Sequence, residues 1–282
     1  MLLQEKVMDI RLIVTDLDGT LLMPDGTVSE RTRRALLACE KRGIPVVFAS
    51  GRTFESLSGL ARTLGLNSPI ISANGARVDL SPSGPAILED YLPEQLADEV
   101  LKILIASEMY VECYSGNAIY FLHPEKSPFP GWPGSRESVT IEGIRQRFVV
   151  GEDAMIREAG HRAYKFAVCS RNAAALDRVR QQLLPLNAAL NSAFPFNIEI
   201  MEKGRGKGRA LKVLTEHLGL SKDQVMAFGD GSNDLEMLQE AGVSVAMENG
   251  FDELKRCVSL IAPDNAHEGE AYIIEQMVLG NV

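Results

Sequence analysis

The stretch VTDLDGTLL (Val14–Leu22) decides the fold class, because it joins an apolar run to two acidic residues and a glycine. The run from Ile10 to Thr15 predicts a buried strand, and Gly19 predicts a turn directly after it. Residues i and i+2 of a strand point to the same side, so Asp16 and Asp18 are expected to face one crevice. Two buried carboxylates repel each other, which indicates that a cation or a reacting group neutralises them.

Short apolar strands alternate with amphipathic helices at both ends of the chain. The N-terminal part predicts strands at Ile10–Thr15, Pro45–Ser50 and Pro69–Ser72, and helices at Ser29–Arg42 and Phe54–Leu64. After Ile200 the pattern predicts helices at Arg205–Leu218 and Leu235–Ala241, and strands at Val225–Phe228 and Val243–Ala246. Unbroken apolar strands separated by helices are typical of a parallel sheet covered on both faces. We therefore predict an α/β fold whose core is a Rossmann-like, doubly wound parallel sheet formed by both ends.

The middle of the chain has a mixed pattern that predicts an inserted α+β domain. Helices are expected at Glu94–Ser107 and Ala173–Leu184, and strands within MYVECY, AIYFLH and YKFAVCS and near Ala188–Asn191 and Asn197–Ile200. A loop rich in proline and glycine, HPEKSPFPGWPGS, lies between them. The expected division is a core of residues 1–82 and 197–282 and an inserted domain of residues 83–196.

Composition and charge exclude several classes of protein. The net charge of −9 argues against a nucleic-acid surface, and no apolar run approaches the roughly 18 residues that span a membrane. The four cysteines have no metal-ligand spacing and are expected to be buried thiols in a reducing cytoplasm. The expected partner is a small molecule, with no nucleic acid and no membrane, and the oligomeric state stays open.

Two further segments offer groups that bind an anion. In VVFASGRT the hydroxyl of Ser50 and the amide of Gly51 follow a strand, although such a pair is often only a turn. In EKGRGKGRALKVL, Lys207 stands between two glycines at the start of a helix, and this segment does not match the ATP-binding phosphate loop. The alternative for Lys207 is that it belongs to a solvated basic face.

A third segment, VMAFGDGSNDLEML, adds acidic and amide groups at the end of another strand. A helix N-cap explains one of Asp230, Asn233 and Asp234, but it does not require three polar residues. Carboxylates are the ligands that Mg²⁺ prefers, and a cation would offset the repulsion among Asp16, Asp18 and Asp230. The four segments together therefore indicate one Mg²⁺ ion and one phosphoryl group.

In this order, DLDGT, SGR, the GKG lysine and GDGSND resemble the four motifs of the haloacid dehalogenase-like hydrolase superfamily. The resemblance is closest to its Cof-type, or sugar-phosphatase-like, branch. It implies a Mg²⁺-dependent phosphatase that acts on a small phosphomonoester, with a sugar phosphate favoured, through an aspartyl-phosphate intermediate. A phosphomutase of the same superfamily and a non-catalytic module that binds a phosphorylated metabolite are the alternatives.

The resemblance also implies a role for each site residue. Asp16 is the nucleophile, and Asp18 is the general acid that protonates the leaving group and then the base that activates water. The metal ligands are the side chains of Asp16 and Asp230 and the backbone carbonyl of Asp18, with Asp234 in support. The groups that bind phosphoryl oxygens are Ser50, Gly51, Lys207 and Asn233.

The position of the inserted domain implies a C2-type α/β cap, which closes over the phosphate and selects the leaving group. Four cap residues could contact a substrate, but none is assigned as a site: Tyr114, His123, Arg136 and Lys165. His123 and Lys165 are equally plausible as surface or strand-edge residues. Asn74 is expected to have a structural role in a turn. The C-terminal segments AMENG and HEGEAYI depart from the family's usual sequence. The shape of the pocket near Asn249 and Glu268 is therefore not predicted.

Overall fold

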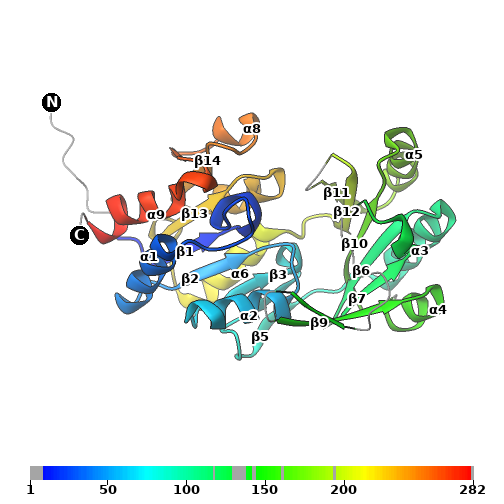
Figure 1. Ribbon diagram of the computed structural model, residues 1–282, viewed down its shortest axis with the longest axis horizontal. Helices are drawn as coiled ribbons and strands as arrows, with labels where there is room; N and C mark the ends of the chain where they lie inside the picture. Colours follow the sequence, from blue (N-terminus) through cyan, green and yellow to red (C-terminus); the bar gives the residue numbers. More distant parts are fainter. Residues whose placement is uncertain are drawn as a thin grey trace.

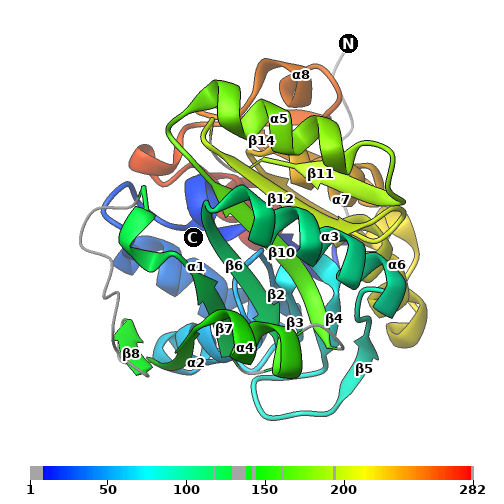
Figure 2. The same ribbon diagram turned by 90° about the vertical axis from the view of Figure 1, so that its right-hand side faces the viewer.

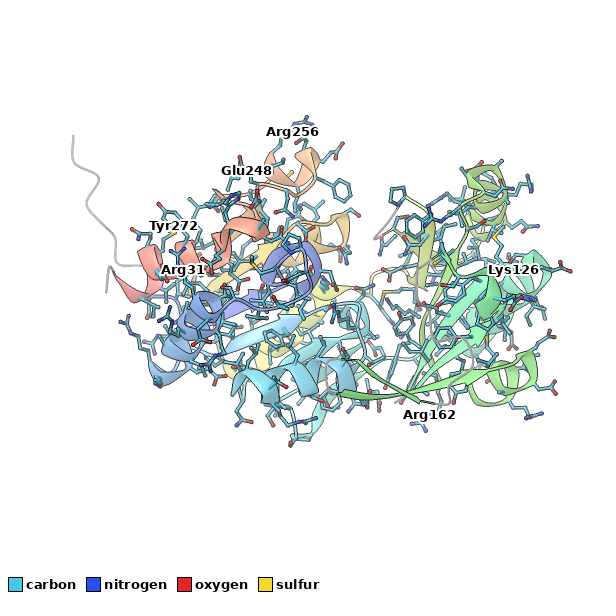
Figure 3. All side chains as sticks on the ribbon, in the orientation of Figure 1. Arg31, Lys126, Arg162, Glu248, Arg256 and Tyr272 are labelled. Atoms are coloured by element: carbon cyan, nitrogen blue, oxygen red, sulfur yellow. The ribbon has the colours of Figure 1, made fainter. Side chains whose placement is uncertain are left out.

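The computed structural model of the chain contains two β-sheets, each of which carries helices of its own (Figure 1). It describes residues 9–116, 118–128, 138–141, 144–159, 162–192 and 195–280. Exposed side chains such as Lys126, Arg162 and Arg256 lie on the outer rim of the molecule (Figure 3). None of the helices in the described part of the chain is long and apolar enough to span a membrane.

The first sheet, which we call the core sheet, joins the two ends of the chain. Its strands are β1 (Leu12–Thr15), β2 (Val46–Ala49), β3 (Ile70–Ser72), β4 (Arg77–Asp79), β5 (Ala86–Glu89), β13 (Val225–Gly229), β14 (Val243–Met247) and β15 (Leu260–Ala262). They lie in the order β15-β14-β13-β1-β2-β3-β4-β5. Pairs from β15 to β3 are parallel, whereas β4 and β5 extend one edge in antiparallel fashion. The predicted doubly wound sheet is confirmed.

Helices cover both faces of the core sheet, because its central strands carry apolar residues on both faces. Ile13 packs in one cluster with α1 (Glu30–Lys41), α2 (Phe54–Leu64) and α9 (Gly269–Ile274). Leu12 and Val14 pack in the opposite cluster with α6 (Lys207–Leu218), α7 (Leu235–Gln239) and α8 (Asp252–Lys255). A strand buried on both faces needs apolar residues at every position, which explains the continuous runs in the sequence.

Local signals position the helices beside the site. Thr53 caps α2, since its side chain accepts a hydrogen bond from the Ser56 amide, and Gly65 ends α2 in a left-handed conformation with φ of 81°. Gly219 ends α6 in the same way, with φ of 67°. The predicted bounds of α2 agree with the structure residue for residue.

The second sheet forms the inserted domain, which we call the cap. Its strands are β6 (Tyr110–Ser115), β7 (Ala118–Leu122), β8 (Ser138–Ile141), β9 (Ile144–Val150), β10 (Ala163–Cys169), β11 (Ala188–Asn191) and β12 (Asn197–Glu202), in the order β11-β12-β10-β6-β7-β9-β8. The helices α3 (Glu94–Ser107), α4 (Glu152–Ala154) and α5 (Ala173–Leu183) lie on the side away from the core (Figures 1 and 2). Phe166 and Val168 of β10 pack toward these helices, so Lys165 lies on the strand face turned to the core.

Strand membership differs from the expected domain division at residues 83 and 196. β5 pairs with β4 and so belongs to the core sheet, and β12 lies between β11 and β10 of the cap sheet. β5 has two exposed ends, so no apolar run marked it in the sequence. β12 belongs to the cap because Ile198 and Ile200 pack against the cap helices.

The cysteines differ from expectation at one position. Cys39, Cys113 and Cys169 are buried free thiols, whereas Cys257 is exposed. Cys257 follows the C-cap of the short helix α8, and this end of the helix lies at the surface.

Candidate active site

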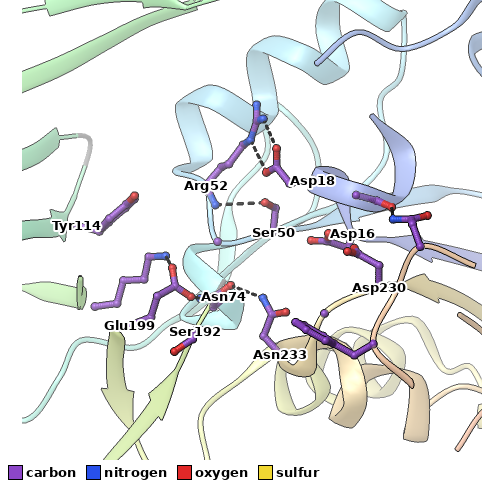
Figure 4. Close-up of a pocket in the computed structure, with 16 residues that line it drawn as sticks. Asp16, Asp18, Ser50, Arg52, Asn74, Tyr114, Ser192, Glu199, Asp230 and Asn233 are labelled. Atoms are coloured by element: carbon purple, nitrogen blue, oxygen red, sulfur yellow. Dashed lines mark hydrogen bonds and ion pairs between the residues drawn. The ribbon is translucent and has the colours of Figure 1, made fainter. Parts of the chain in front are cut away.

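The carboxyl ends of β1, β2 and β13 open into a pocket of about 490 Å³ between core and cap (Figure 4). These strands are neighbours and parallel, so side chains that follow them meet at one edge of the sheet. Predicted site residues that line this pocket are Asp16, Asp18, Ser50, Gly51, Asp230 and Asn233. The other two, Lys207 and Asp234, are fully buried against Asp16.

The turn after β1 is shaped by contact with the strand beside it. The amide of Asp16 donates to the carbonyl of Phe228 at the end of β13, at 3.1 Å. Gly19 has φ of 90° and its Cα lies against the Asp230 carboxylate, with which a Cβ atom would collide. Only glycine suits both the left-handed backbone and this close approach. The GDGSND and DLDGT segments are therefore in direct contact.

Lys207 is the cation of the pocket floor. Its Nζ atom donates to Oδ1 of Asp16 and to Oδ1 of Asp234, each at 2.6 Å. Burial by itself lowers the pKa of Lys207, but the two carboxylates outweigh burial and raise the pKa above its usual value. Lys207 is therefore a permanently charged group that holds Asp16 in position.

Asp234 organises the turn after β13. Its Oδ2 atom accepts hydrogen bonds from the amides of Asp230, at 3.1 Å, and Gly231, at 2.9 Å, while Oδ1 accepts from Lys207. Both carboxylate oxygens are therefore engaged by the protein, and Asp234 orients the loop that carries Asp230.

The acidic groups of the floor exceed its cations. Carboxylate oxygens of Asp16, Asp230 and Asp234 lie within 4.8 Å of one another, whereas Lys207 is the one ammonium group that contacts them among the described residues. Burial raises the pKa of Asp230 to about 6, and burial also raises the pKa of Asp16, against the effect of Lys207. This excess of negative charge and the oxygen-only donor set fit a divalent cation such as Mg²⁺.

Two of the three carboxylates have an oxygen to offer to such a cation. Thr20 Oγ1 donates to Oδ1 of Asp230 at 2.8 Å, and Lys207 occupies Oδ1 of Asp16. None of the hydrogen bonds between side chains of the described residues uses Oδ2 of Asp16 or Oδ2 of Asp230. Asp16 and Asp230 are therefore better placed to bind a metal than Asp234.

Asp18 lies at the pocket mouth and is paired with an arginine that we did not assign from the sequence. Arg52 donates from Nε and Nη2 to the two oxygens of Asp18, at 3.0 and 2.7 Å (Figure 4). The Asp18 side chain is 58% exposed. Arg52 directly follows the Ser50-Gly51 pair, so its position beside the motif was the available signal.

Asn74 connects three parts of the site. Its backbone amide donates to the Ser50 carbonyl at 2.9 Å. In its side chain, Oδ1 accepts from Asn233 Nδ2 at 3.4 Å, and Nδ2 donates to Oε2 of Glu199 in the cap at 2.8 Å. Its left-handed backbone, with φ of 55°, suits asparagine better than most residues. The expected turn is present, and its side chain also takes part in the site.

The cap supplies the opposite wall of the pocket. Tyr114, Lys165, Ser192 and Glu199 line it, and Figure 4 shows Tyr114 and Glu199 across the pocket from the core carboxylates. Tyr114 and Lys165 are cap candidates to which the sequence assigned no role, whereas Ser192 and Glu199 were not predicted from the sequence. Glu199 alternates with apolar residues along β12, and this alternation is a signal that it faces away from the cap core.

His123, another cap candidate, is not among the described residues that line this pocket. His123 lies 3.3 Å from Glu125 of its own turn. Arg136 falls outside the described residues.

The two C-terminal segments have different positions. Asn249 lines the pocket, and its Nδ2 donates to the Gly19 carbonyl at 2.8 Å, so AMENG supports the turn after β1. Glu268 instead pairs with Arg31 at 3.4 Å, away from the pocket lining.

Glu270 of HEGEAYI is a buried acid behind β1. Its Oε2 lies 2.9 Å from Thr15 Oγ1, which also donates to the Asp16 carbonyl at 2.7 Å. Its Oε1 has no hydrogen-bond partner among the described residues. Burial raises the pKa of Glu270 to about 8, with the Thr15 hydroxyl opposing the rise. With this pKa the Glu270 carboxyl is mostly protonated at pH 7, and its contact with Thr15 stabilises the end of β1.

Comparison with known proteins places this site in a family. The family model of haloacid dehalogenase-like hydrolases matches residues 13–274. An HMP-PP phosphatase of Escherichia coli is 32% identical over 254 residues, which cover 87% of this chain and 86% of the relative. A 5-amino-6-(5-phospho-D-ribitylamino)uracil phosphatase of Bacillus subtilis is 29% identical, over 96% of this chain and 99% of the relative.

A solved structure gives the same result for the whole molecule. A haloacid dehalogenase-like hydrolase from Bacteroides thetaiotaomicron matches with a TM-score of 0.80 and 27% identity, over 95% of this chain and 99% of that chain. The match includes both the core and the cap, so the resemblance seen in the four motifs extends to the inserted domain. The chain belongs to the family of haloacid dehalogenase-like hydrolases.

Proposed function

We propose that this protein is a Mg²⁺-dependent phosphatase that hydrolyses a small phosphomonoester, with a sugar phosphate favoured, through an aspartyl-phosphate intermediate. The observation that carries the proposal is the Asp16 carboxylate, which buried Lys207 holds at 2.6 Å on the floor of a pocket that Asp18 shares. A nucleophile held in place and an acid at the pocket mouth are what a two-step hydrolysis needs.

The first step is an attack by an Asp16 oxygen on phosphorus. The bond from phosphorus to the ester oxygen breaks, and Asp18 donates a proton to the departing alcohol. Asp18 then accepts a proton from water, and the water oxygen attacks the phosphorus of the aspartyl-phosphate. Inorganic phosphate leaves, and Asp16 is regenerated.

The surrounding groups bind the phosphoryl oxygens as their charge shifts. We assign this role to the Ser50 hydroxyl, the Gly51 amide and the Asn233 side chain, which line the pocket. Lys207 contributes its positive charge through Asp16. Bound by Asp16, Asp230 and the backbone carbonyl of Asp18, Mg²⁺ would neutralise charge on the phosphoryl group. Asp234 supports that site by orienting the loop of Asp230.

Two relatives support a small phosphorylated metabolite as the substrate. The Bacillus subtilis relative is named for a substrate with a phosphorylated ribityl chain, and the Escherichia coli relative for HMP-PP. A pocket of about 490 Å³ suits molecules of this size.

Phosphate release from a panel of phosphomonoesters, with Mg²⁺, tests the proposal. We expect wild type to release free phosphate and Asp16→Asn to lose about 10⁴-fold or more in kcat, because the variant has no nucleophile. Asp98→Asn, at an exposed position of α3, is the matched control and should retain wild-type activity.

Three outcomes would contradict it. Unchanged phosphate release by Asp16→Asn rules out Asp16 as the nucleophile. Transfer of phosphate between substrate positions without accumulation of free phosphate favours the phosphomutase. Binding of phosphorylated metabolites without turnover favours the non-catalytic module.

A further inference from the structure

The inner face of the cap carries a buried charged pair next to the phosphate-binding loop. Lys165 of β10 and Glu199 of β12 stand on adjacent antiparallel strands, and Tyr114 of β6 is the cross-strand partner of Lys165. Lys165 is 1% exposed and Glu199 is 8% exposed. All three residues line the pocket. Burying a charge costs free energy, so a buried lysine and a buried glutamate at a pocket wall indicate a role in binding a ligand.

Lys165 has one carboxylate partner among the described residues. Its Nζ atom donates to Oε1 of Glu199 at 2.5 Å, and the ring centroid of Tyr114 lies 4.4 Å from Nζ. The nearby Glu112 is engaged elsewhere, because Tyr110 and Tyr114 donate their hydroxyls to its two oxygens. An ammonium group has three donors, and the bond to Glu199 uses one of them. Lys165 therefore has donor capacity to offer to the pocket.

The pair lies within reach of the ester group. A Cβ atom added to Gly51 would lie 3.0 Å from Nζ of Lys165 and 2.9 Å from Oδ1 of Asn74. Asn74 in turn donates to Oε2 of Glu199 at 2.8 Å, which ties the cap pair to the core. A group that binds the cap pair must therefore sit close to the phosphoryl group that Gly51 faces.

The charge balance of the pocket favours a neutral group there. Lys165 is neutralised by Glu199. A second anionic group bound at this pair would meet the Glu199 carboxylate, whose ion-pair partner among the described residues is Lys165 alone. A hydroxyl meets no such conflict, because it can accept from Lys165 and donate to Glu199 at the same time.

We propose that Lys165 and Glu199 form a hydroxyl-binding clamp that selects leaving groups with a hydroxyl on a carbon adjoining the phosphoester. The inference rests on the proposed phosphatase activity, and it assigns the choice of alcohol to two cap residues. Asn74 is a positioning residue that holds Glu199 against the core.

The first test needs wild type only. Glycerol 3-phosphate and propyl phosphate have the same carbon chain, but only the former has hydroxyls. We expect kcat/KM for glycerol 3-phosphate to exceed that for propyl phosphate by about 10- to 100-fold, because the analogue leaves a charged donor and acceptor unpaired. Equal values for the two esters overturn the clamp. Failure of wild type to release phosphate from every ester overturns the proposed function itself.

The second test measures the same ratio in Lys165→Met and Glu199→Gln. We expect the preference for glycerol 3-phosphate to fall by about tenfold in each variant. Lys102→Met, at an exposed position of α3, is the matched control and should keep the wild-type ratio. An equal fall for both esters, with the ratio unchanged, assigns the pair a structural role and overturns the clamp.

A further variant guards against misfolding. Lys165→Met leaves Glu199 as a buried unpaired charge, whereas Lys165→Met combined with Glu199→Gln leaves none. Thermal unfolding identifies which variants are folded. In the folded double variant, the ratio of kcat/KM for glycerol 3-phosphate to kcat/KM for propyl phosphate should be close to one. A wild-type ratio in the folded double variant overturns the clamp.

Discussion

Two buried lysines on opposite sides of one pocket differ in how their charge is balanced. Lys207 in the core contacts two carboxylates, Asp16 and Asp234, at 2.6 Å each. Lys165 in the cap contacts one carboxylate, Glu199, and the ring of Tyr114. Both are almost completely removed from solvent.

The difference separates two tasks that a lysine can perform. Lys207 is bound on two sides, so it fixes Asp16 and the Asp230 loop and has little freedom to follow a ligand. Lys165 has a single ionic partner and borders the open pocket, so it can form further hydrogen bonds with a bound molecule. The two lysines are equally buried, so the number of carboxylates around each ammonium group distinguishes Lys207 of the core from Lys165 of the cap.

Removal of the core lysine should have the largest effect. We expect Lys207→Met to lower the free energy of unfolding by about 3–5 kcal/mol, because two buried carboxylates lose their ammonium partner. Phosphate release should fall by about 10²- to 10³-fold as Asp16 loses its position. Urea denaturation and phosphate assays measure the two effects. Lys212→Met, at an exposed position of the same helix, is the control, and equal stability of the two variants would contradict the assigned role of Lys207.

Double variants sharpen the contrast. Lys165→Met should lower the free energy of unfolding by about 3 kcal/mol, and adding Glu199→Gln should restore most of that loss, because no buried charge is left unpaired. Lys207→Met with Asp234→Asn should recover little, since Asp16 remains unpaired. Urea denaturation of the four variants provides the comparison. Equal recovery in core and cap would refute the distinction.

Metal binding should stabilise the core site and be independent of the cap pair. At a concentration 100 times its Kd, Mg²⁺ should raise the free energy of unfolding of wild type by about 2.7 kcal/mol. Asp230→Asn should lose this gain, because it removes a proposed ligand, whereas Lys165→Met should keep it. Denaturation with Mg²⁺ and with EDTA measures the difference. A gain that persists in Asp230→Asn would place the metal elsewhere.

Glu270 provides a third case, a buried acid that contacts no lysine among the described residues. Its folded pKa of about 8 lies above its ordinary value of 4.5, so its contribution to stability is complete below about pH 4.5 and is lost as the pH rises through about 8. Between about pH 6.5 and about pH 7.5 wild type should lose about 1 kcal/mol relative to Glu270→Gln, which cannot titrate.

The pH dependence of urea denaturation measures this difference. Asp16 and Asp230 titrate in both proteins, so the comparison isolates Glu270. Glu253→Gln, at an exposed position of α8, should follow wild type. A parallel pH dependence of Glu270→Gln and wild type would show that Glu270 is ionised in the fold.

The sequence predicted the parts of the site that follow from local pattern. Asp16, Asp230 and Ser50 each follow an apolar run, and neighbouring parallel strands bring such residues to one edge. The bounds of α2 were predictable because Thr53 and Gly65 carry standard cap signals. The same reasoning failed for β5, whose ends are exposed and whose short pattern has no periodic signal.

Other parts of the site were beyond local pattern. Arg52 could pair with Asp18 only once the two loops were placed side by side, 34 residues apart in the chain. The alternation along β12 indicates that Glu199 faces away from an apolar core, but only the placement of the strand in the cap sheet shows that this face lines the pocket. The contact of Asn74 with Glu199 joins core and cap across 125 residues.

The sequence by itself determined the class of fold and the chemistry of the pocket floor, because apolar periodicity and acidic residues at strand ends are local properties. Only the tertiary structure decided how the buried titratable groups are paired: among the described residues, Lys207 contacts two carboxylates and Lys165 contacts one, whereas Glu270 contacts the Thr15 hydroxyl and no cation. The physical reason is that the energy of a buried charge depends on neighbours a few ångströms away, and those neighbours come from distant segments of the chain.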